Sequence, residues 1–195
     1  MAKRIRLGAL ISGGGTNLQA IIDACESDRI DAEVVFVGSD TPQAAGLERA
    51  RRHAIPVFVV DYRAAAHSFR KAPGAAELPP DFRLDEIRAQ QGLLAKNADP
   101  ARLDEFLKIR AVAEAALLAA MQPFSFDLLV LAGFMRNLTP YFIDRVNADR
   151  AVPRIMNIHP ALLPAFPGTD GYGDTLRYGC KVAGCTVHFV DYGED

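Results

Sequence analysis

The stretch RIRLGALISGGGTNLQAII (4–22) decides the fold class. Its LGALI run is apolar without interruption, which is typical of a β-strand that is covered on both faces. The glycines of SGGGTN (12–17) break this strand, and Leu18, Ile21 and Ile22 then recur at the spacing of an amphipathic helix. The stretch therefore predicts a buried strand, a glycine-rich turn and a helix, which together open a parallel sheet.

The same alternation continues along the chain. AEVVFVGS (32–39) and IPVFVV (55–60) predict two further buried strands, with a helix over 44–53 between them. This β-α-β-α-β order is typical of an α/β protein with a doubly wound, mostly parallel sheet. The remaining predicted elements are strands over 127–133, 154–160 and 185–191, and helices over 98–121, from Thr139 and over 171–179.

Residues 62–97 interrupt this rhythm. They include KAPGAAELPPD, which is rich in proline, glycine and alanine. A loop of this length in a compact domain is usually functional or inserted. We expect residues 62–97 to be an insertion or long loop, with a short helix within 83–95, inside a single domain that spans 1–195.

Composition limits the function classes. A chain of 195 residues that is 50% hydrophobic can bury one domain core. The 22 basic and 24 acidic residues give a net charge of -2, which predicts neither nucleic acid nor a membrane surface as partner. No apolar run approaches the ~18 residues of a membrane span. The three cysteines lack CxxC spacing, so we expect no disulfide framework, no metal site and a cytoplasmic location.

The glycine turn is the first candidate binding site. Glycines between a strand and a helix let backbone N–H groups approach a phosphate, and the helix N-terminus adds partial positive charge. Thr16 and Asn17 offer side-chain hydrogen bonds. The turn has neither GxGxxG nor GK[ST] spacing, so it is not a dinucleotide fingerprint or a P-loop. The alternative is a tight turn that binds nothing.

The tetrapeptide NIHP (157–160) is the second candidate. Residues i and i+2 of a strand share a face, so Asn157 and His159 point together while Ile158 points into packing. Open parallel sheets bind their ligands at the carboxyl ends of strands. An amide beside an imidazole can stabilise an oxyanion and supply a proton. The alternative is a polar strand end that meets solvent.

The final residues, HFVDYGED (188–195), place three acids after an apolar strand. A carboxylate beside His159 would raise the pKa of the imidazole and orient the ring. Spacing alone leaves open which acid does so, and a solvated turn is the alternative reading. His188 lies within the strand and is predicted to be a hydrogen-bonded structural histidine. The three acids are Asp191, Glu194 and Asp195.

Four segments together resemble the glycinamide ribonucleotide formyltransferases. They are LISGGGTNLQAIIDA (10–24), DLLVLAGFMRNLTP (127–140), NIHPALLPAFPG (157–168) and GCTVHFVDYGED (184–195). HPALLPAFPG is typical of the wider formyl-folate transferase superfamily, whereas SGGGTNLQA separates this branch from the methionyl-tRNA formyltransferases. The resemblance implies a Rossmann-like formyltransferase fold. It also implies transfer of the formyl group of 10-formyltetrahydrofolate to the amine of 5'-phosphoribosylglycinamide in de novo purine biosynthesis. It leaves the oligomeric state open, with a homodimer as one form.

The resemblance also assigns roles to residues. It implies direct transfer, in which the substrate amine attacks the formyl carbon, an amide and a protonated imidazole stabilise the oxyanion, and a carboxylate supports the imidazole. The implied catalytic residues are Asn157, His159 and Asp195, the last placed seven residues after His188. The implied phosphate-binding residues are Gly15, Thr16 and Asn17. The implied folate-binding residues are Met135, Arg136, Asn137 and Leu138 in the pteridine pocket, with Asp191, Tyr192, Gly193 and Glu194 in the loop around the ring.

Three departures from the family pattern lead to further expectations. Residues 62–97 are longer than the usual connection, in which a folate-contacting arginine lies, and Arg63 and Arg70 are both candidates. PGTDGYGDTLRYG (167–179) replaces a loop that carries a histidine in many members. The family continues beyond the position of Asp195, so we expect this chain to lack the C-terminal part of the domain and to be weakly active or inactive.

Two alternatives to the transferase remain. A formyltetrahydrofolate hydrolase shares the site but uses water as acceptor, and it normally carries an N-terminal regulatory domain, whereas this sequence reaches its first catalytic-domain strand at Arg4. A non-catalytic nucleotide- or folate-binding module belongs to a different class. Replacing His159 by alanine separates the classes, because an enzyme loses turnover while a binding module keeps its affinity.

Overall fold

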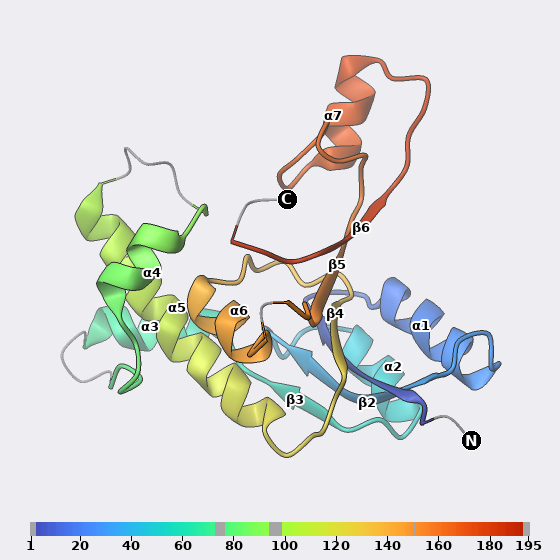
Figure 1. Ribbon diagram of the computed structural model, residues 1–195, viewed down its shortest axis with the longest axis horizontal. Helices are drawn as coiled ribbons and strands as arrows, with labels where there is room; N and C mark the ends of the chain where they lie inside the picture. Colours follow the sequence, from blue (N-terminus) through green and yellow to red (C-terminus); the bar gives the residue numbers. More distant parts are fainter. Residues whose placement is uncertain (1–2, 73–76, 94–98, 150, 193–195) are drawn as a thin grey trace.

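The computed structural model describes residues 3–72, 77–93, 99–149 and 151–192. A sheet of six strands in the order β3-β2-β1-β4-β5-β6 forms its centre (Figure 1). Neighbouring strands pair in parallel, except β6, which pairs with β5 in antiparallel orientation. The prediction of a mostly parallel α/β sheet is confirmed. The strands are β1 (Ile5–Ile11), β2 (Ala32–Ser39), β3 (Val57–Val59), β4 (Leu128–Leu131), β5 (Ile155–His159) and β6 (Thr186–Phe189).

Helices cover both faces of this sheet, which explains why its central strands are apolar throughout. Leu10 and Phe36 belong to the core on one face, whereas Ile11 and Val37, their neighbours in sequence, belong to the core on the other. Helices α1 and α2 pack on the second face, and α5 and α6 on the first (Figure 1). The helices are α1 (Thr16–Glu26), α2 (Gly46–Arg52), α3 (Tyr62–Lys71), α4 (Leu84–Gln90), α5 (Pro100–Met121), α6 (Pro140–Val146) and α7 (Gly171–Tyr178).

Within residues 62–97, the short helix predicted in 83–95 is α4, whereas α3 was missed, because residues 62–71 were expected to belong to an insertion or long loop. The Asp61 carboxylate caps α3 by accepting hydrogen bonds from the backbone N–H groups of Arg63 (2.9 Å) and Ala64 (3.0 Å). The helix then buries Tyr62 and Phe69. The proline- and glycine-rich residues that follow obscured this capped, alanine-rich helix.

Helix α5 follows its predicted signals. The Asp99 carboxylate accepts a hydrogen bond from the backbone N–H of Ala101 (2.9 Å), and Pro100 occupies the first turn. Among the described residues, no helix combines the length and the apolar character that crossing a membrane requires. Helix α7 stands away from the sheet, beyond β5 and β6, where Figure 1 colours it orange-red.

Candidate functional site

The glycine turn and the segment after β4 meet at the carboxyl edge of the sheet. The backbone N–H of Ser12 donates to the carbonyl of Gly133 (3.0 Å), and the N–H of Met135 donates to the Ser12 hydroxyl (2.8 Å). Open parallel sheets place ligands at this edge. Two segments that the sequence predicted as separate binding elements are therefore directly hydrogen-bonded to each other.

Gly15 needs to be glycine for two reasons. Its φ of 70° lies in the left-handed region, and a Cβ atom there would come within 2.7 Å of the Gly46 Cα. Thr16 and Asn17 follow, both exposed, as the first residues of α1. No side chain of the described residues caps this helix. Its first N–H groups, together with Thr16 and Asn17, are therefore available to an anion.

Arg136 is held by a buried carboxylate. Its Nε donates to Asp40 Oδ2 at 2.5 Å, and Asp40 is only 1% exposed. The other carboxylate oxygen, Oδ1, has no hydrogen-bond partner among the described residues. The Arg136 guanidinium also lies 5.8 Å from the centre of the Tyr62 ring. The sequence analysis missed Asp40, although its position directly after the apolar run of β2 is a usable signal.

A small cavity of about 50 Å³ brings several predicted residues together. It gathers three of the four residues assigned to the pteridine pocket with Asn157 of the catalytic set and Asp191 of the folate loop. Leu93, which follows the end of α4, also contributes, and no sequence signal assigned it to a site. The lining residues are Leu93, Leu131, Phe134, Arg136, Asn137, Leu138, Asn157, Val190 and Asp191.

Met135 faces a wider cleft of about 650 Å³ beside the glycine turn. Arg63 lines this cleft. By contrast, the Nε of Arg70 pairs with Glu105 Oε1 at 2.8 Å in a different cavity, between α3 and α5. The structure therefore separates the two candidate arginines, which the sequence could not. The residues of the cleft are Ser12, Asp40, Thr41, Gln43, Asp61, Arg63, Met135 and Arg136.

Asn157 and His159 both lie on β5, but in different surroundings. The Asn157 amide nitrogen lies 3.4 Å from His188 Nε2 on the facing strand. His159 is only 3% exposed, and its Nε2 lies 2.7 Å from the carbonyl oxygen of Phe166. A carbonyl can only accept, so Nε2 carries the hydrogen and Nδ1 is the ring nitrogen left for chemistry. Asn157 thus lines the small cavity, whereas His159 is packed beneath the segment that leads to α7.

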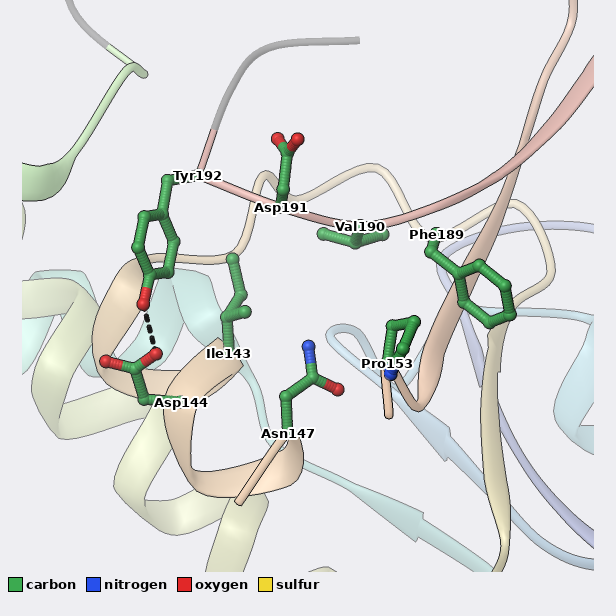
Figure 2. A pocket seen from close by; sticks show the side chains of 8 residues that line it. All are labelled: Ile143, Asp144, Asn147, Pro153, Phe189, Val190, Asp191 and Tyr192. Atoms are coloured by element: carbon green, nitrogen blue, oxygen red, sulfur yellow. Dashed lines mark hydrogen bonds between the residues drawn. The ribbon is translucent and has the colours of Figure 1, made fainter. Parts of the chain in front are cut away.

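Asp191 and Tyr192 follow β6 and turn in different directions (Figure 2). The Tyr192 hydroxyl donates to the Asp144 carboxylate on α6, while the Asp191 carboxylate points away from that helix. The Tyr192 carbonyl also accepts a hydrogen bond from the N–H of Gly92 (3.0 Å). Both residues line a pocket of about 310 Å³ between α6 and β6. The other predicted residues of this end, Gly193, Glu194 and Asp195, lie outside the described residues.

A buried carboxylate supports the segment after β4 from below. Glu114 on α5 accepts hydrogen bonds from the backbone N–H (2.9 Å) and the hydroxyl (2.5 Å) of Thr139, which directly follows Leu138. Burial raises the pKa of Glu114 to about 7, although the two hydrogen bonds act in the opposite direction. The sequence analysis did not identify this residue, because an acid within a helical pattern is usually on the exposed face.

Metal ligands do not gather in the part of the chain that the structure describes, where no three His, Cys, Asp or Glu side chains come together. Besides the carboxylates of Asp40, Asp61 and Asp191, the carboxyl edge carries backbone N–H groups, amides, an imidazole and guanidinium groups. These latter groups can donate hydrogen bonds, so they suit anionic or carbonyl-bearing organic molecules.

Comparison with known proteins identifies relatives over the whole of this arrangement. The family model described as formyl transferase matches residues 5–195. The phosphoribosylglycinamide formyltransferase of Mycobacterium tuberculosis is 38% identical over 190 residues, which cover 97% of this chain and 66% of that protein. The human trifunctional purine biosynthetic protein adenosine-3 is 32% identical over 188 residues, or 96% of this chain and 14% of that protein.

Solved structures agree with these matches. The crystal structure of glycinamide ribonucleotide transformylase 1 from Symbiobacterium toebii superposes with a TM-score of 0.67 at 37% identity, covering 100% of this chain and 70% of that one. Phosphoribosylglycinamide formyltransferase from Bacillus halodurans superposes with a TM-score of 0.68 at 28% identity, covering 97% of this chain and 74% of that one. The chain thus spans less than two thirds of the length of the human and mycobacterial relatives.

Proposed function

This chain belongs to the formyl transferase family, and from that premise we propose that its site transfers a formyl group from 10-formyltetrahydrofolate to the amine of 5'-phosphoribosylglycinamide. Both substrates are small molecules, and the reaction belongs to purine biosynthesis in the cytoplasm. The observation that carries the proposal is the direct hydrogen bonding between the glycine turn and the segment after β4. That contact supports a phosphate site beside a folate site, as a transfer between two bound substrates requires.

The substrate phosphate binds at Gly15, Thr16 and Asn17. The left-handed Gly15 lets the chain enter α1 with its first N–H groups pointing outward, and the exposed Thr16 and Asn17 add side-chain donors. The positive end of the helix dipole favours the dianion. The amine of the substrate then extends toward the end of β5.

The pteridine ring binds at Arg136, Asn137 and Leu138. Apolar side chains of the small cavity suit the faces of a flat ring, while Asn137, Asn157 and Asp191 suit its polar edge. The cavity of about 50 Å³ is smaller than the roughly 300–1,000 Å³ of typical ligand sites. Binding therefore requires the segment of Asp191 and Tyr192 to move outward, and in the family pattern Gly193 and Glu194 complete the loop around the ring.

The glutamate tail of the folate lies in the wider cleft beside Met135. Arg63 lines this cleft and is the arginine that we assign to a tail carboxylate. We do not assign Arg70 to this role, because it lines a different cavity, where it pairs with Glu105. Arg136 also borders the cleft, but Asp40 already compensates its charge.

The chemistry is direct attack of the amine on the formyl carbon. The Asn157 amide donates to the oxygen that becomes negative in the tetrahedral intermediate, and the protonated imidazole of His159 supplies a second donor through Nδ1, since its Nε2–H is engaged by the Phe166 carbonyl. Asp195, which the family pattern places seven residues after His188, supports the imidazole. The proton lost by the attacking amine passes to the leaving folate nitrogen as the carbon–nitrogen bond to the folate breaks.

Replacing His159 by alanine tests this function in the protein that contains this chain. Formyl transfer is measured with 10-formyltetrahydrofolate and 5'-phosphoribosylglycinamide as substrates. Loss of one oxyanion donor should lower kcat by about 10²–10³-fold, while both KM values stay within a few-fold. The control is His67→Ala, which changes an exposed histidine of α3 and should leave all constants unchanged.

Other outcomes identify the alternatives. Formate release at the same rate with and without 5'-phosphoribosylglycinamide would indicate a hydrolase. Binding of both substrates without turnover in the unmodified protein, and with unchanged affinity in His159→Ala, would indicate a binding module and refute the proposal.

A further inference from the structure

Helix α2 holds the glycine turn through two consecutive carbonyl groups. The backbone N–H of Gly46 donates to the carbonyl of Gly13 at 3.0 Å. One helical turn later, Nε of Arg49 donates to the carbonyl of Gly14 at 2.8 Å. Both carbonyl groups of the turn are therefore directed toward the same helix.

This anchoring determines where the neighbouring N–H groups point. A trans peptide is planar, with its C=O and N–H on opposite sides. Because the carbonyls of Gly13 and Gly14 face α2, the N–H groups of Gly14 and Gly15 face away from it. Within the described residues, no backbone hydrogen bond uses these two N–H groups. Successive N–H groups on one side of a turn form a concave anion site.

Arg49 is itself oriented by a chain of hydrogen bonds. Its Nη1 lies 3.5 Å from the amide oxygen of Gln19, whose Nε2 bonds to Asp23 (2.9 Å) and lies 3.1 Å from His53 Nε2. His53 Nδ1 lies 2.7 Å from a Glu26 carboxylate oxygen. The carboxylate can only accept, so Nδ1 carries the hydrogen and Nε2 accepts from Gln19. With both amide hydrogens of Gln19 used, its oxygen is turned toward Arg49.

We propose that Arg49 is a positioning residue for the phosphate site, with Gln19 and His53 holding it in place. It fixes the peptide between Gly14 and Gly15 so that the N–H faces the ligand, and its guanidinium adds positive charge beside the turn. This inference rests on the proposed function, in which the turn binds the phosphate of 5'-phosphoribosylglycinamide. The other arginines of α2 make different contacts, because Arg51 pairs with the Glu48 carboxylate and the Nε of Arg52 donates to the Glu48 carbonyl (3.4 Å).

Steady-state kinetics of Arg49→Met test the inference. Loss of a hydrogen bond from a charged donor should raise the KM for 5'-phosphoribosylglycinamide about tenfold. The KM for formyl-folate and kcat should change by less than about twofold, since a lost contact to the phosphate affects ground state and transition state equally. Inorganic phosphate, used as a competitive inhibitor, should weaken by the same factor as the substrate.

Two further variants grade the effect, and one controls for the loss of an arginine. Arg49→Lys keeps one donor for the Gly14 carbonyl but has no second branch for Gln19. Its KM for 5'-phosphoribosylglycinamide should therefore lie between the wild-type and Arg49→Met values. Gln19→Met leaves Arg49 in place but removes its side-chain support, and should raise the same KM about threefold. Arg51→Met changes an exposed arginine of the same helix and should have no effect.

Asn17→Ala distinguishes failure of this inference from failure of the proposed function. If Asn17→Ala raises the KM for 5'-phosphoribosylglycinamide but Arg49→Met does not, Arg49 has no positioning role and the phosphate site stands. If neither variant changes that KM, the phosphate assignment of the glycine turn is itself wrong. Should Arg49→Met fail to fold, unchanged KM values in both Arg49→Lys and Gln19→Met overturn the inference.

Discussion

The two helical layers of this protein bury different kinds of side chain. On the face of α1 and α2, the core includes Leu18, Ile22 and Leu47, and the buried polar residue two positions after Val37 on β2 is the uncharged Ser39. On the face of α5 and α6, the buried residues include Glu114 and Thr139 beside apolar neighbours. Among the described residues, the first layer therefore buries no charged side chain, whereas the second depends on a buried carboxylate and its hydrogen bonds.

The two proposed substrate-binding segments at the carboxyl edge are held in correspondingly different ways. Helix α2 holds the glycine turn through hydrogen bonds that Gly46 and Arg49 donate to its carbonyl groups. Helix α5 holds the segment after β4 from the buried side, through Glu114 and Thr139. A buried acid makes stability depend on pH and uncharged core side chains do not, so the two supports should be separable by experiment.

The largest effects should come from truncating the core of each layer. Leu18→Ala and Leu117→Ala each remove a side chain that is 0% exposed. Each should lower the free energy of unfolding by about 2–5 kcal/mol, through lost burial and the cavity left behind. Denaturant titration measures this loss. If the free energy of unfolding of either variant falls by less than about 1 kcal/mol, that layer is not closely packed against the sheet, and the comparison of the two layers is contradicted.

Stability should depend on pH through Glu114. Its pKa is raised from the ordinary 4.5 to about 7 by burial. The folded state thus binds the proton more tightly than the unfolded chain. The stability that this proton contributes to the folded state is fully present below pH 4.5 and is lost as the pH rises through 7. At about 1.4 kcal/mol per pKa unit, the loss is about 3 kcal/mol. Denaturant titrations at a series of pH values from 5 to 8 measure it.

The matched variant for this effect is Glu114→Gln, which mimics the protonated acid and cannot titrate. Its stability should exceed that of the wild-type protein at pH 8 and approach it at pH 5. Other groups titrate equally in both proteins, so the difference between the two curves isolates Glu114. Parallel curves would show that Glu114 is not the group responsible.

The order of the strands and of the helices other than α3 could be predicted because it depends on local signals. Continuous apolar runs indicate doubly covered strands, and the Asp99–Pro100 pair marks the start of α5. The contact between the glycine turn and the segment after β4 also follows from topology, since the carboxyl ends of parallel strands meet at one edge.

The lining of the site could not be predicted in the same way. Asp40 and Leu93 border the site only because of how β2 and the segment after α4 pack in the folded protein. The periodicity of apolar residues in the sequence does not predict this packing. The choice between Arg63 and Arg70 likewise depended on the course of α3. The catalytic roles of Asn157 and His159 remain predictions, as does that of Asp195, which lies outside the described residues.

The smallest effect concerns Asp40, and it tests whether the two substrate segments are independent. Asp40→Asn keeps an oxygen for Arg136 but removes the charge, and it places an amide group where Oδ1 has no partner among the described residues. Exchanging a charged for a neutral acceptor should cost about 1 kcal/mol, or roughly a fivefold rise in the KM for formyl-folate. Glu48→Gln, which changes an exposed acid of α2, is the control and should change neither KM value.

Because Asp40 holds Arg136 and not the glycine turn, the KM for 5'-phosphoribosylglycinamide should stay constant in Asp40→Asn. An equal rise in both KM values would mean that the hydrogen bonds of Ser12 couple the two segments into one unit.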